Sequence, residues 1–381
     1  MRFAVRRASA ACLAIPLFLF PGRGAGNPGG GVASPDAASP SRFSAQPSIL
    51  GSHPLCEPSA AVRPPWAPGR VLVADNEISG GLFSFRRAGD SLVDQQTVPL
   101  PAGLAPADIE ALAVADGNLI VVGSMSRNKR CEVRLARQRI LVMSWEVSRQ
   151  RLKPVRLIDC AEAWKKAATT VEGCLKALFT DPPPALAQEV CASIVLAEQE
   201  ARPGTRDCRT LNVEGAVAVP AQSPAGRERV WLGLRSPLVG SAAALLRLTP
   251  GLDAFRFDAV ALVGFNDLGI RELALAEGRL WGIAGPAGDR PGDPHSLWSL
   301  PAASLAPGAR LLPDGPPVAL PASSEGMDFA GGSAIALIDG DYGGDGAPAC
   351  LVPGRQITVN LPPRSGVLPP TRGAGRSGNG R

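Results

Sequence analysis

The stretch IEALAVADGNLIVVG, residues 109–123, decides the fold. An acidic residue near its start is followed by small and apolar residues, a turn that contains Asp and Gly, and a second apolar segment. Short apolar segments rich in Val, Ile and Leu that flank such a turn predict an antiparallel strand pair. The stretch is therefore predicted to form a β-hairpin.

The same pattern recurs along the chain, as CEPSAAV with RVLVADNE, VEGAVAV with RVWLGLRSP, IRELALAEG with RLWGIAGPA, and SEGMDFAGG with SAIALIDGD. The acids of the five copies are spaced by 53, 104, 58 and 53 residues and are Glu57, Glu110, Glu214, Glu272 and Glu325. Repeats of about 40 to 50 residues with turn signals are typical of propeller blades. Because 104 is twice 52, a degenerate copy around Asp159–Glu162 is expected in the gap. We predict an all-β protein, a β-propeller of about six blades, with five to seven possible.

Small residues follow several of these acids, as in Ala111, Gly215 and Gly326. They are expected where the innermost strands of a propeller converge and space for side chains is limited.

The segment of about residues 159–208 has a different period. Its apolar residues recur at helical spacing on both sides of the break Asp181-Pro-Pro-Pro184, and they are Ala163, Ala167, Val171, Cys174, Leu175 and Leu178, then Leu186, Val190, Ile194 and Val195. Spacings of three and four residues predict amphipathic helices. An αα-hairpin inserted in the propeller is expected here.

The two ends of the chain differ from its middle. Residues 1–25 contain four arginines, residues 353–381 contain five, and neither segment has an acid, so the rest of a chain with net charge +5 carries −4. A slightly acidic body disfavours a nucleic-acid-binding core. With 43 Gly and 38 Pro, the composition also argues against a mostly helical protein.

The N-terminus has the features of a signal peptide. Residues 1–7 carry three arginines, residues 8–20 form a 13-residue apolar run, and residues 21–25 are small and turn-prone. The run is shorter than the roughly 20 residues of a membrane span, so no transmembrane span is expected. We predict a signal peptide at 1–25, a disordered linker at 26–55, a propeller at 56–353 and a basic disordered tail at 354–381. The protein is expected to be exported, to the periplasm or the extracellular medium, as a monomer.

Eight cysteines in an exported chain predict disulfides. One, Cys12, lies in the predicted signal peptide. Cys174 and Cys191 fall on the apolar faces of the predicted helices and are expected to pair, and Cys160 with Cys208 would close the base of the insertion. A bond from Cys56 to Cys350 would clasp the ring and contribute about 4 to 5 kcal/mol at best. Cys131 would then be free.

Several segments, read together, resemble an uncharacterised bacterial family of predicted secreted β-propellers that is known as a domain of unknown function. They are SAAV with VADNE, GSMSRNKR, NVEGAV, WLGLRSPL, DLGIREL and GIAGPAGD, and they span roughly Cys56 to Asp345. The resemblance implies the fold more than the chemistry. The helical insertion departs from the pattern, as does Ile270-Arg271-Glu272, where the acid lies one position late. More distantly, the repeats are similar to esterase-like phytases and gluconolactonase-type propellers, whose axial acids hold calcium.

In a propeller the repeated acids would meet at one mouth of the central channel. Such carboxylates cannot all stay ionised without a cation, an arginine or a proton between them. Carboxylate ligands suit Ca²⁺, and two histidines in the whole chain, His53 and His295, make zinc improbable. The predicted metal site uses Glu57, Glu110, Glu214 and Glu325. The alternative is that each Glu binds backbone N–H groups of the next blade and that no metal is present.

A second, weaker candidate for calcium is the loop DGDYGGDG with Asp339, Asp341 and Asp345. Its alternating acids resemble a small calcium loop, but the full EF-hand pattern is absent. A plain acidic turn is the alternative. Asp75, Asn76 and Glu77 occupy the corresponding loop of the first copy.

Basic residues follow the strand that ends near Gly123. Arg127 and Lys129, with Arg235 in the equivalent loop of a later copy, would bind a phosphate or carboxylate beside the metal. The alternative is a solvated strand pair. Interleaved aromatic residues are missing, so no nucleic acid is expected, and no nucleotide-binding glycine motif supports a nucleotide cofactor.

Two functions remain open. The first is a Ca²⁺-dependent hydrolase of an anionic ester, phosphoester or lactone at the channel mouth, with Glu110 or Glu214 as candidate base and Arg127, Lys129 and Arg235 as anion ligands. The second is a non-catalytic propeller that binds a small anionic molecule, protein or glycan of the cell envelope. In that case, deletion of residues 160–208 is expected to abolish binding and leave the ring folded.

Overall fold

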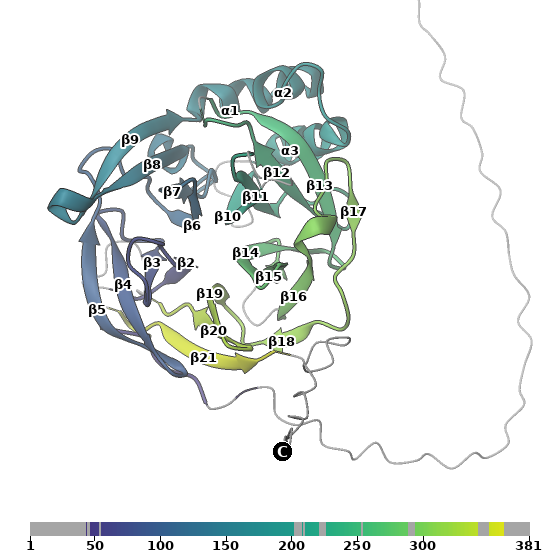
Figure 1. Ribbon diagram of the computed structural model, residues 1–381. Coiled ribbons are helices and arrows are strands. Elements are labelled where there is room, and N and C mark those ends of the chain that lie inside the picture. The colour runs from purple at the N-terminus through teal and green to yellow at the C-terminus, as the bar shows by residue number, and fades with distance from the viewer. Residues whose placement is uncertain are drawn as a thin grey trace, which may run out of the picture. The chain divides into compact units, whose positions relative to one another are not determined.

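Each copy of the repeat forms the two innermost strands of one blade in the computed structural model (Figure 1). The structure describes residues 43, 46–52, 55–201, 208, 210–220, 226–252, 254–288, 294–341 and 350–361. Within this part of the chain there are five sheets, and their innermost strands contact one another in a closed ring. The predicted β-propeller is confirmed, with five blades, the lower end of the expected range.

Four of the blades run outward in chain order. The first contains β2 (Pro58–Val62), β3 (Arg70–Asp75), β4 (Gly81–Ala88) and β5 (Ser91–Pro99). The second contains β6 (Ile109–Ala115), β7 (Asn118–Gly123), β8 (Arg139–Glu146) and β9 (Arg151–Asp159). The third contains β10 (Asn212–Val219), β11 (Arg229–Ser236), β12 (Ala242–Leu248) and β13 (Phe257–Gly264), with β17 (Arg310–Leu311) parallel to β13. The fourth contains β14 (Leu268–Ala276), β15 (Arg279–Pro286), β16 (His295–Pro301) and β18 (Val318–Leu320).

The fifth blade joins the two ends of the chain. It contains β19 (Ser324–Ala330), β20 (Ser333–Ile338), β21 (Arg355–Asn360) and, outermost, β1 (Ser48–Ile49). β1 and β21 lie outside the predicted propeller limits of 56–353. β21 was not predicted because its alternation of apolar and polar residues is short and lies in a segment with the composition of a disordered tail. Ile357 and Val359 of this strand are buried. The predicted Cys56–Cys350 disulfide is present and links the same two ends.

The prediction of a further copy of the repeat around Asp159–Glu162 is wrong. Asp159 ends β9, and α1 (Ala161–Ala167) begins two residues later. The long interval between the second and third acids comes from the helical insertion, which contains α1, α2 (Val171–Leu178) and α3 (Ala187–Glu200). Three short 3-10 helices at Leu135–Arg137, Val147–Arg149 and Ala302–Ser304 complete the described elements.

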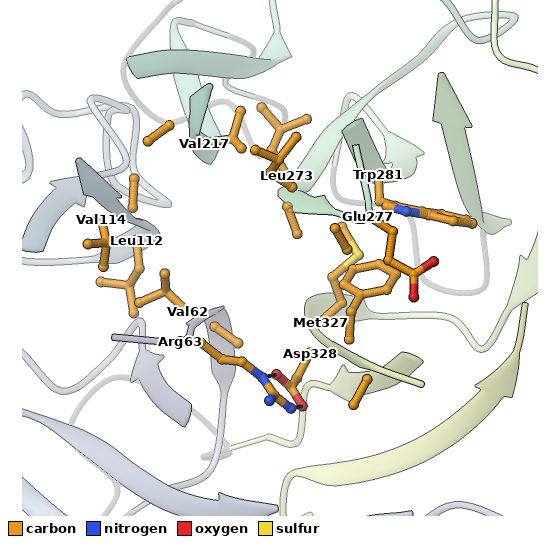
Figure 2. Close-up of a pocket in the computed structure, with 18 of the residues that line it drawn as sticks. Val62, Arg63, Leu112, Val114, Val217, Leu273, Glu277, Trp281, Met327 and Asp328 are labelled. Carbon is orange, nitrogen blue, oxygen red and sulfur yellow. Dashed lines mark hydrogen bonds and ion pairs between the residues drawn. The ribbon is translucent and has the colours of Figure 1, made fainter. Parts of the chain in front are cut away.

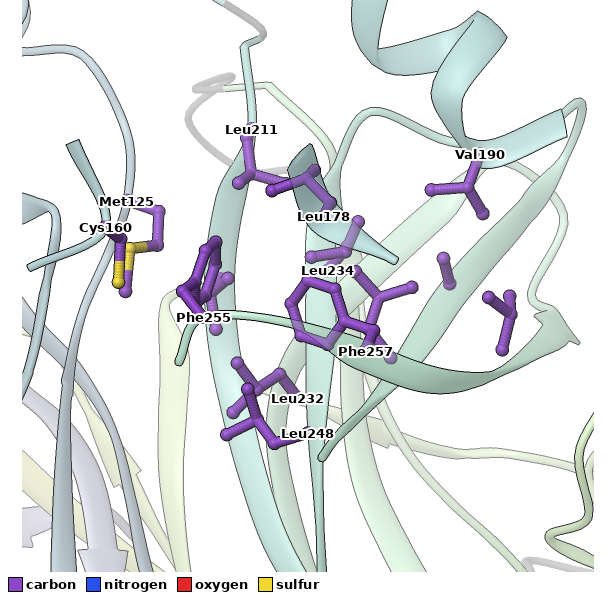
Figure 3. Close-up of a cluster of buried hydrophobic side chains, with 14 of the residues drawn as sticks. Met125, Cys160, Leu178, Val190, Leu211, Leu232, Leu234, Leu248, Phe255 and Phe257 are labelled. Atoms are coloured by element: carbon purple, nitrogen blue, oxygen red, sulfur yellow. The ribbon is translucent and has the colours of Figure 1, made fainter. Parts of the chain in front are cut away.

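The helical insertion is confirmed, and it is part of the hydrophobic core. The backbone N–H of Thr180 donates to the carbonyl of Phe257 on β13 over 3.1 Å, and the rings of Phe179 and Phe257 lie 5.9 Å apart between centroids. Figure 3 shows Leu178 and Val190 of the helices near Leu234 and Phe257 of the third blade. The Cys174–Cys191 disulfide joins α2 to α3, as predicted.

The predicted Cys160–Cys208 pair is wrong, because Cys208 is bonded to Cys131. Cys160 is left as the free cysteine of the described residues. It immediately precedes α1 and is buried in the core near Met125 (Figure 3). Cys131 lies in the loop after β7, and this loop contacts α3 through an ion pair between Arg127 and Glu198. Long-range packing that the repeat pattern cannot show therefore decides the pairing.

Several predictions lie outside the described residues: the signal peptide, most of the linker with His53, the tail beyond residue 361, and Asp345. None of the helices in the described part has the length and apolar character that a membrane crossing requires.

Candidate functional site

A β-bulge lies on the innermost strand of every blade. Pairing with the second strand skips one residue in each case, and the skipped residues are Ser59, Glu110, Glu214, Arg271 and Glu325. A bulge re-aims the side chain of its extra residue. Four of the five skipped residues line one mouth of the central channel. The bulges on β6, β10, β14 and β19, placed at equivalent positions, therefore bring functional groups of four strands to this mouth.

Two of the aligned acids are not at the bulges. Glu57 precedes β2 and still lines the channel mouth, whereas Glu272 is fully buried and does not. Its Oε1 accepts the N–H of Leu273 at 2.8 Å and its Oε2 accepts the N–H of Ala61 at 3.1 Å, on a strand of a non-adjacent blade. Glu272 thus binds backbone N–H groups, but of its own strand and of a non-adjacent blade rather than of the next blade.

The small residues beside the acids are required by close packing. A Cβ atom added to Gly215 would lie 2.8 Å from Cγ of Leu273, and one added to Gly233 would lie 2.6 Å from Cγ2 of Ile270. These distances are shorter than ordinary van der Waals contact, so β10 and β11 approach β14 only because both residues are glycine.

Arg271 supplies the positive charge that the ring of acids needs. Its Nε lies 3.0 Å from Oε2 of Glu214, and its other end contacts Glu325, so one guanidinium joins carboxylates of the two neighbouring blades. The side chains of all three are almost completely buried. Burial lowers the pKa of Arg271, while Glu214 opposes that shift.

The ring opens into a cavity of about 230 Å³, which we call the channel-mouth pocket. Its charged residues are seven acids and five bases: Glu57, Glu77, Asp108, Glu110, Glu214, Glu325 and Asp339, with Arg127, Lys129, Arg137, Arg235 and Arg271. Asn76, Asn128, Asn212 and Ser126 add neutral polar groups. Such a lining can hydrogen-bond a polar ligand from every side.

Each of the five bases faces a carboxylate. Arg127 binds Glu198 of α3 at 2.6 Å, and Arg235 binds Glu214 at 2.8 Å. Lys129 is 3.8 Å from Glu77 and largely exposed. The predicted anion ligands are thus in the pocket, but all three are ion-paired within the protein, Lys129 over the longest distance.

Two acids in the pocket have strongly raised pKa values. Glu110 is 8% exposed, and among the described residues its carboxyl has no hydrogen-bond or ion-pair partner. Burial, followed by repulsion from Asp108 and Glu214, raises its pKa well above the ordinary value of 4.5. Burial and repulsion from Glu57 likewise raise the pKa of Asp339, whose Oδ1 is buried without a partner in the described structure. The pKa of Asp108 is raised less, because Arg137 at 2.8 Å offsets its burial.

The predicted calcium ligands are brought to one mouth but not into one coordination sphere. Arg271 lies between Glu214 and Glu325, and no group of three or more His, Cys, Asp or Glu residues in the described part of the chain is arranged to hold a metal ion. In the second candidate loop, Asp339 lines the pocket, whereas the backbone of Asp341 pairs with Val352. The calcium site therefore stays a prediction.

Three charged members of the site were not predicted from the sequence, namely Asp108, Arg137 and Arg271. Arg271 occupies the bulge where the other copies have an acid, and the one-residue offset of Glu272 was the available signal. Arg137 lies in the pocket beside Asp108. Its role depends on the path of the loop between β7 and β8, which no local pattern indicates.

Solved structures with related architecture are distant. An unknown-function protein from Dyadobacter fermentans is 9% identical, with 83% of this chain and 98% of that chain covered and a TM-score of 0.39. A putative 6-phosphogluconolactonase from Bacteroides uniformis is 14% identical, with 84% and 72% covered and a TM-score of 0.33. An exo-beta-1,3-galactanase from Phanerochaete chrysosporium is 10% identical, with 83% and 63% covered and a TM-score of 0.39. Similarity at this level says nothing about activity.

Sequence comparison gives the family. No curated protein matches this chain. A family model matches residues 90–312, which is more than half of the chain and includes most of the segments on which the expected resemblance rests. The chain belongs to the family described as "Protein of unknown function (DUF3616)".

Proposed function

We propose that the channel-mouth pocket is the active site of a hydrolase that cleaves a lactone or glycosidic C–O bond in a small, hydroxyl-rich substrate. The observation that carries the proposal is Glu110, an unpaired carboxyl that is buried in a polar cavity and has a raised pKa. A carboxyl in that state can give a proton to a leaving oxygen near neutral pH.

Asp339 is the partner carboxyl in this proposal. The negative charge of Asp339 is among those that raise the pKa of Glu110. Two carboxyl groups that repel each other lose their protons in separate steps, so one can be an acid while the other is a base. Asp339 would take a proton from the attacking water, and Glu110 would protonate the oxygen of the bond that breaks.

A neutral substrate fits this pocket better than an anionic one. Because each base already faces a carboxylate, an anion would have to displace a glutamate or aspartate from its arginine. Sugar-like hydroxyl groups can donate to the many carboxylate oxygens and accept from Asn212 and Asn128. We therefore propose a lactone or glycoside in place of the anionic ester or phosphoester that the sequence suggested.

The test is a screen of aldonolactones and aryl glycosides with the purified protein and the variant Glu110→Gln. Turnover by the wild type that is lost by at least about 100-fold in the variant supports the proposal. Glu172→Gln is the matched control, because Glu172 is an exposed glutamate of α2 that does not line the pocket, and its turnover is expected to equal that of the wild type. Equal turnover in Glu110→Gln would contradict the assignment of the acid.

A non-catalytic role is the second candidate, and the ion-paired ring favours it. Glu214, Arg271 and Glu325 form ion pairs across three blades, an arrangement that serves ring stability without any reaction. In that case the pocket would bind a sugar-like ligand without product formation. Calorimetry with the same compounds separates binding from turnover.

We also propose that the protein is exported. Three disulfides in the described residues support an oxidising compartment, because disulfides are rare in the cytosol. Fractionation of cells that produce the full chain, with N-terminal sequencing of the mature protein, tests this proposal.

A further inference from the structure

The central channel has a second cavity at its other end, which we call the apolar cavity. It measures about 460 Å³ and shares no residue with the channel-mouth pocket among the residues that the structure describes. The innermost strands of all five blades line it with residues that follow the bulges. Its volume lies within the range of ligand sites, roughly 300 to 1,000 Å³.

The two cavities differ in chemistry. Figure 2 shows apolar side chains from every side of the apolar cavity, including Val62, Leu112, Val217, Leu273 and Met327. Trp281 and Phe329 add an aromatic pair, with ring centroids 5.3 Å apart. A channel lined in this way exposes apolar surface to water at a cost, and an apolar ligand would remove that surface from water.

Glu272 lies in the chain between a residue of each cavity. Its carboxyl accepts the N–H groups of Ala61 and Leu273, two residues that line the apolar cavity, while the preceding residue, Arg271, lines the channel-mouth pocket. Burial raises the pKa of Glu272 well above the ordinary carboxyl value, which favours the neutral form.

One side of the apolar cavity is positively charged. Asp328 is bound by Arg63 through two hydrogen bonds of 2.5 and 2.7 Å and by Arg87 at 2.9 Å, so two guanidinium groups share one carboxylate. The Arg63 side chain is 41% exposed, which leaves part of its guanidinium accessible. The other charged lining residue, Glu277, lies beside Trp281 and away from Arg63 (Figure 2), and it is exposed to solvent, where its charge is screened.

We propose that the apolar cavity binds a small apolar carboxylate of the medium-chain fatty-acid type. The carboxylate would meet Arg63 at the rim, and the hydrocarbon chain would lie among Leu112, Val217, Leu273 and Met327. The net positive charge of the Arg63, Arg87 and Asp328 cluster selects an anion, and the apolar walls select the chain. This site does not depend on the proposed hydrolase activity.

The experiment is titration calorimetry of the full mature protein with decanoate, decanol and decylamine. Saturable binding with decanoate tightest and decylamine weakest is expected. Arg63→Gln should weaken decanoate by roughly tenfold and leave decanol unchanged, because only the headgroup contact is lost. Arg149→Gln is the matched control, since Arg149 is an exposed, ion-paired arginine outside the channel and should change nothing.

A second variant tests the cavity itself. Ala274 lines the cavity and is only partly buried, so Ala274→Phe would fill part of it and should weaken decanoate and decanol together. Glu110→Gln should bind decanoate as the wild type does, which separates this site from the channel-mouth pocket. Absence of saturable decanoate binding, or equal affinity in wild type, Arg63→Gln and Ala274→Phe with unchanged circular dichroism, would overturn the proposal. If Arg63→Gln does not fold, Arg63→Lys keeps the charge and must retain the preference for decanoate over decanol.

Discussion

Nε of Arg271 on β14 lies 3.0 Å from Oε2 of Glu214 on β10, within an ion-paired group that also includes Glu325 on β19. These contacts connect three successive blades at the axis, where almost no solvent reaches the side chains. Removing one partner of a buried ion pair leaves an uncompensated charge, which costs far more than the pair contributes as a whole.

Arg271→Gln is therefore expected to lower the free energy of unfolding by about 3 to 5 kcal/mol at neutral pH. Urea denaturation at neutral pH measures the loss. Arg247→Gln is the control: Arg247 and Asp258 form a more exposed pair at 2.6 Å, and its loss should cost no more than about 1 kcal/mol.

Glu110→Gln is expected to stabilise the protein at neutral and higher pH. The raised pKa of Glu110 means that its neutral form is the favoured one in the folded state, so the wild type loses stability as the pH rises above about 4.5 and through the raised pKa. The amide does not titrate, so a gain on the order of 1 kcal/mol or more is expected at neutral pH, while near pH 4 the two proteins should be alike. Thermal melts of both proteins across this pH range are the measurement. Melting temperatures that change with pH in the same way in both proteins would contradict a raised pKa of Glu110.

The helical insertion is expected to fold with the ring rather than independently. Phe179 is fully buried against Phe257, so Phe179→Ala should cost about 3 to 5 kcal/mol. Leu196 on α3 is 56% exposed, and Leu196→Ala should change stability by less than about 0.5 kcal/mol. Deletion of residues 160–208 is then expected to unfold the ring, against the expectation from the sequence. A folded deletion variant with wild-type circular dichroism would restore that first expectation.

Cys160 is expected to react with iodoacetamide only after denaturation. It is buried, and burial raises the pKa of its thiol well above the ordinary value, so the reactive thiolate is disfavoured. Peptide mapping of protein that is alkylated before or after denaturation, without reduction, identifies the modified cysteine. Modification of Cys131 in its place would mean that the Cys160–Cys208 pairing is correct after all.

The repeat was enough to predict the propeller, because each copy carries the strand, turn and strand of an inner hairpin. The number of blades was harder to predict from the sequence. The interval between Glu110 and Glu214 contains both the outer strands of a blade and three helices, and a length of chain alone does not distinguish these from another blade.

The candidate site was predictable only in part, for a geometric reason. Glu110, Glu214 and Glu325 lie at the bulges, and the sequence pattern found all three. Glu57 and Glu272 were aligned with them by residue type, whereas the structure aligns Ser59 and Arg271. The aligned acid lies one position after the bulge in the fourth blade and two positions before it in the first. A pattern that follows residue identity rather than register does not detect such offsets.

The strand order of the fifth blade also sets an order of assembly. Ser48 on β1 pairs with Gln356 on β21, two residues 308 positions apart in the chain. During synthesis, β1 can pair with β21 only after nearly the whole polypeptide has been made. The first four blades can form their own sheets earlier, but the ring can close only at the end. Truncated chains that stop before β21 would thus carry an open edge on β20, which invites pairing with other chains.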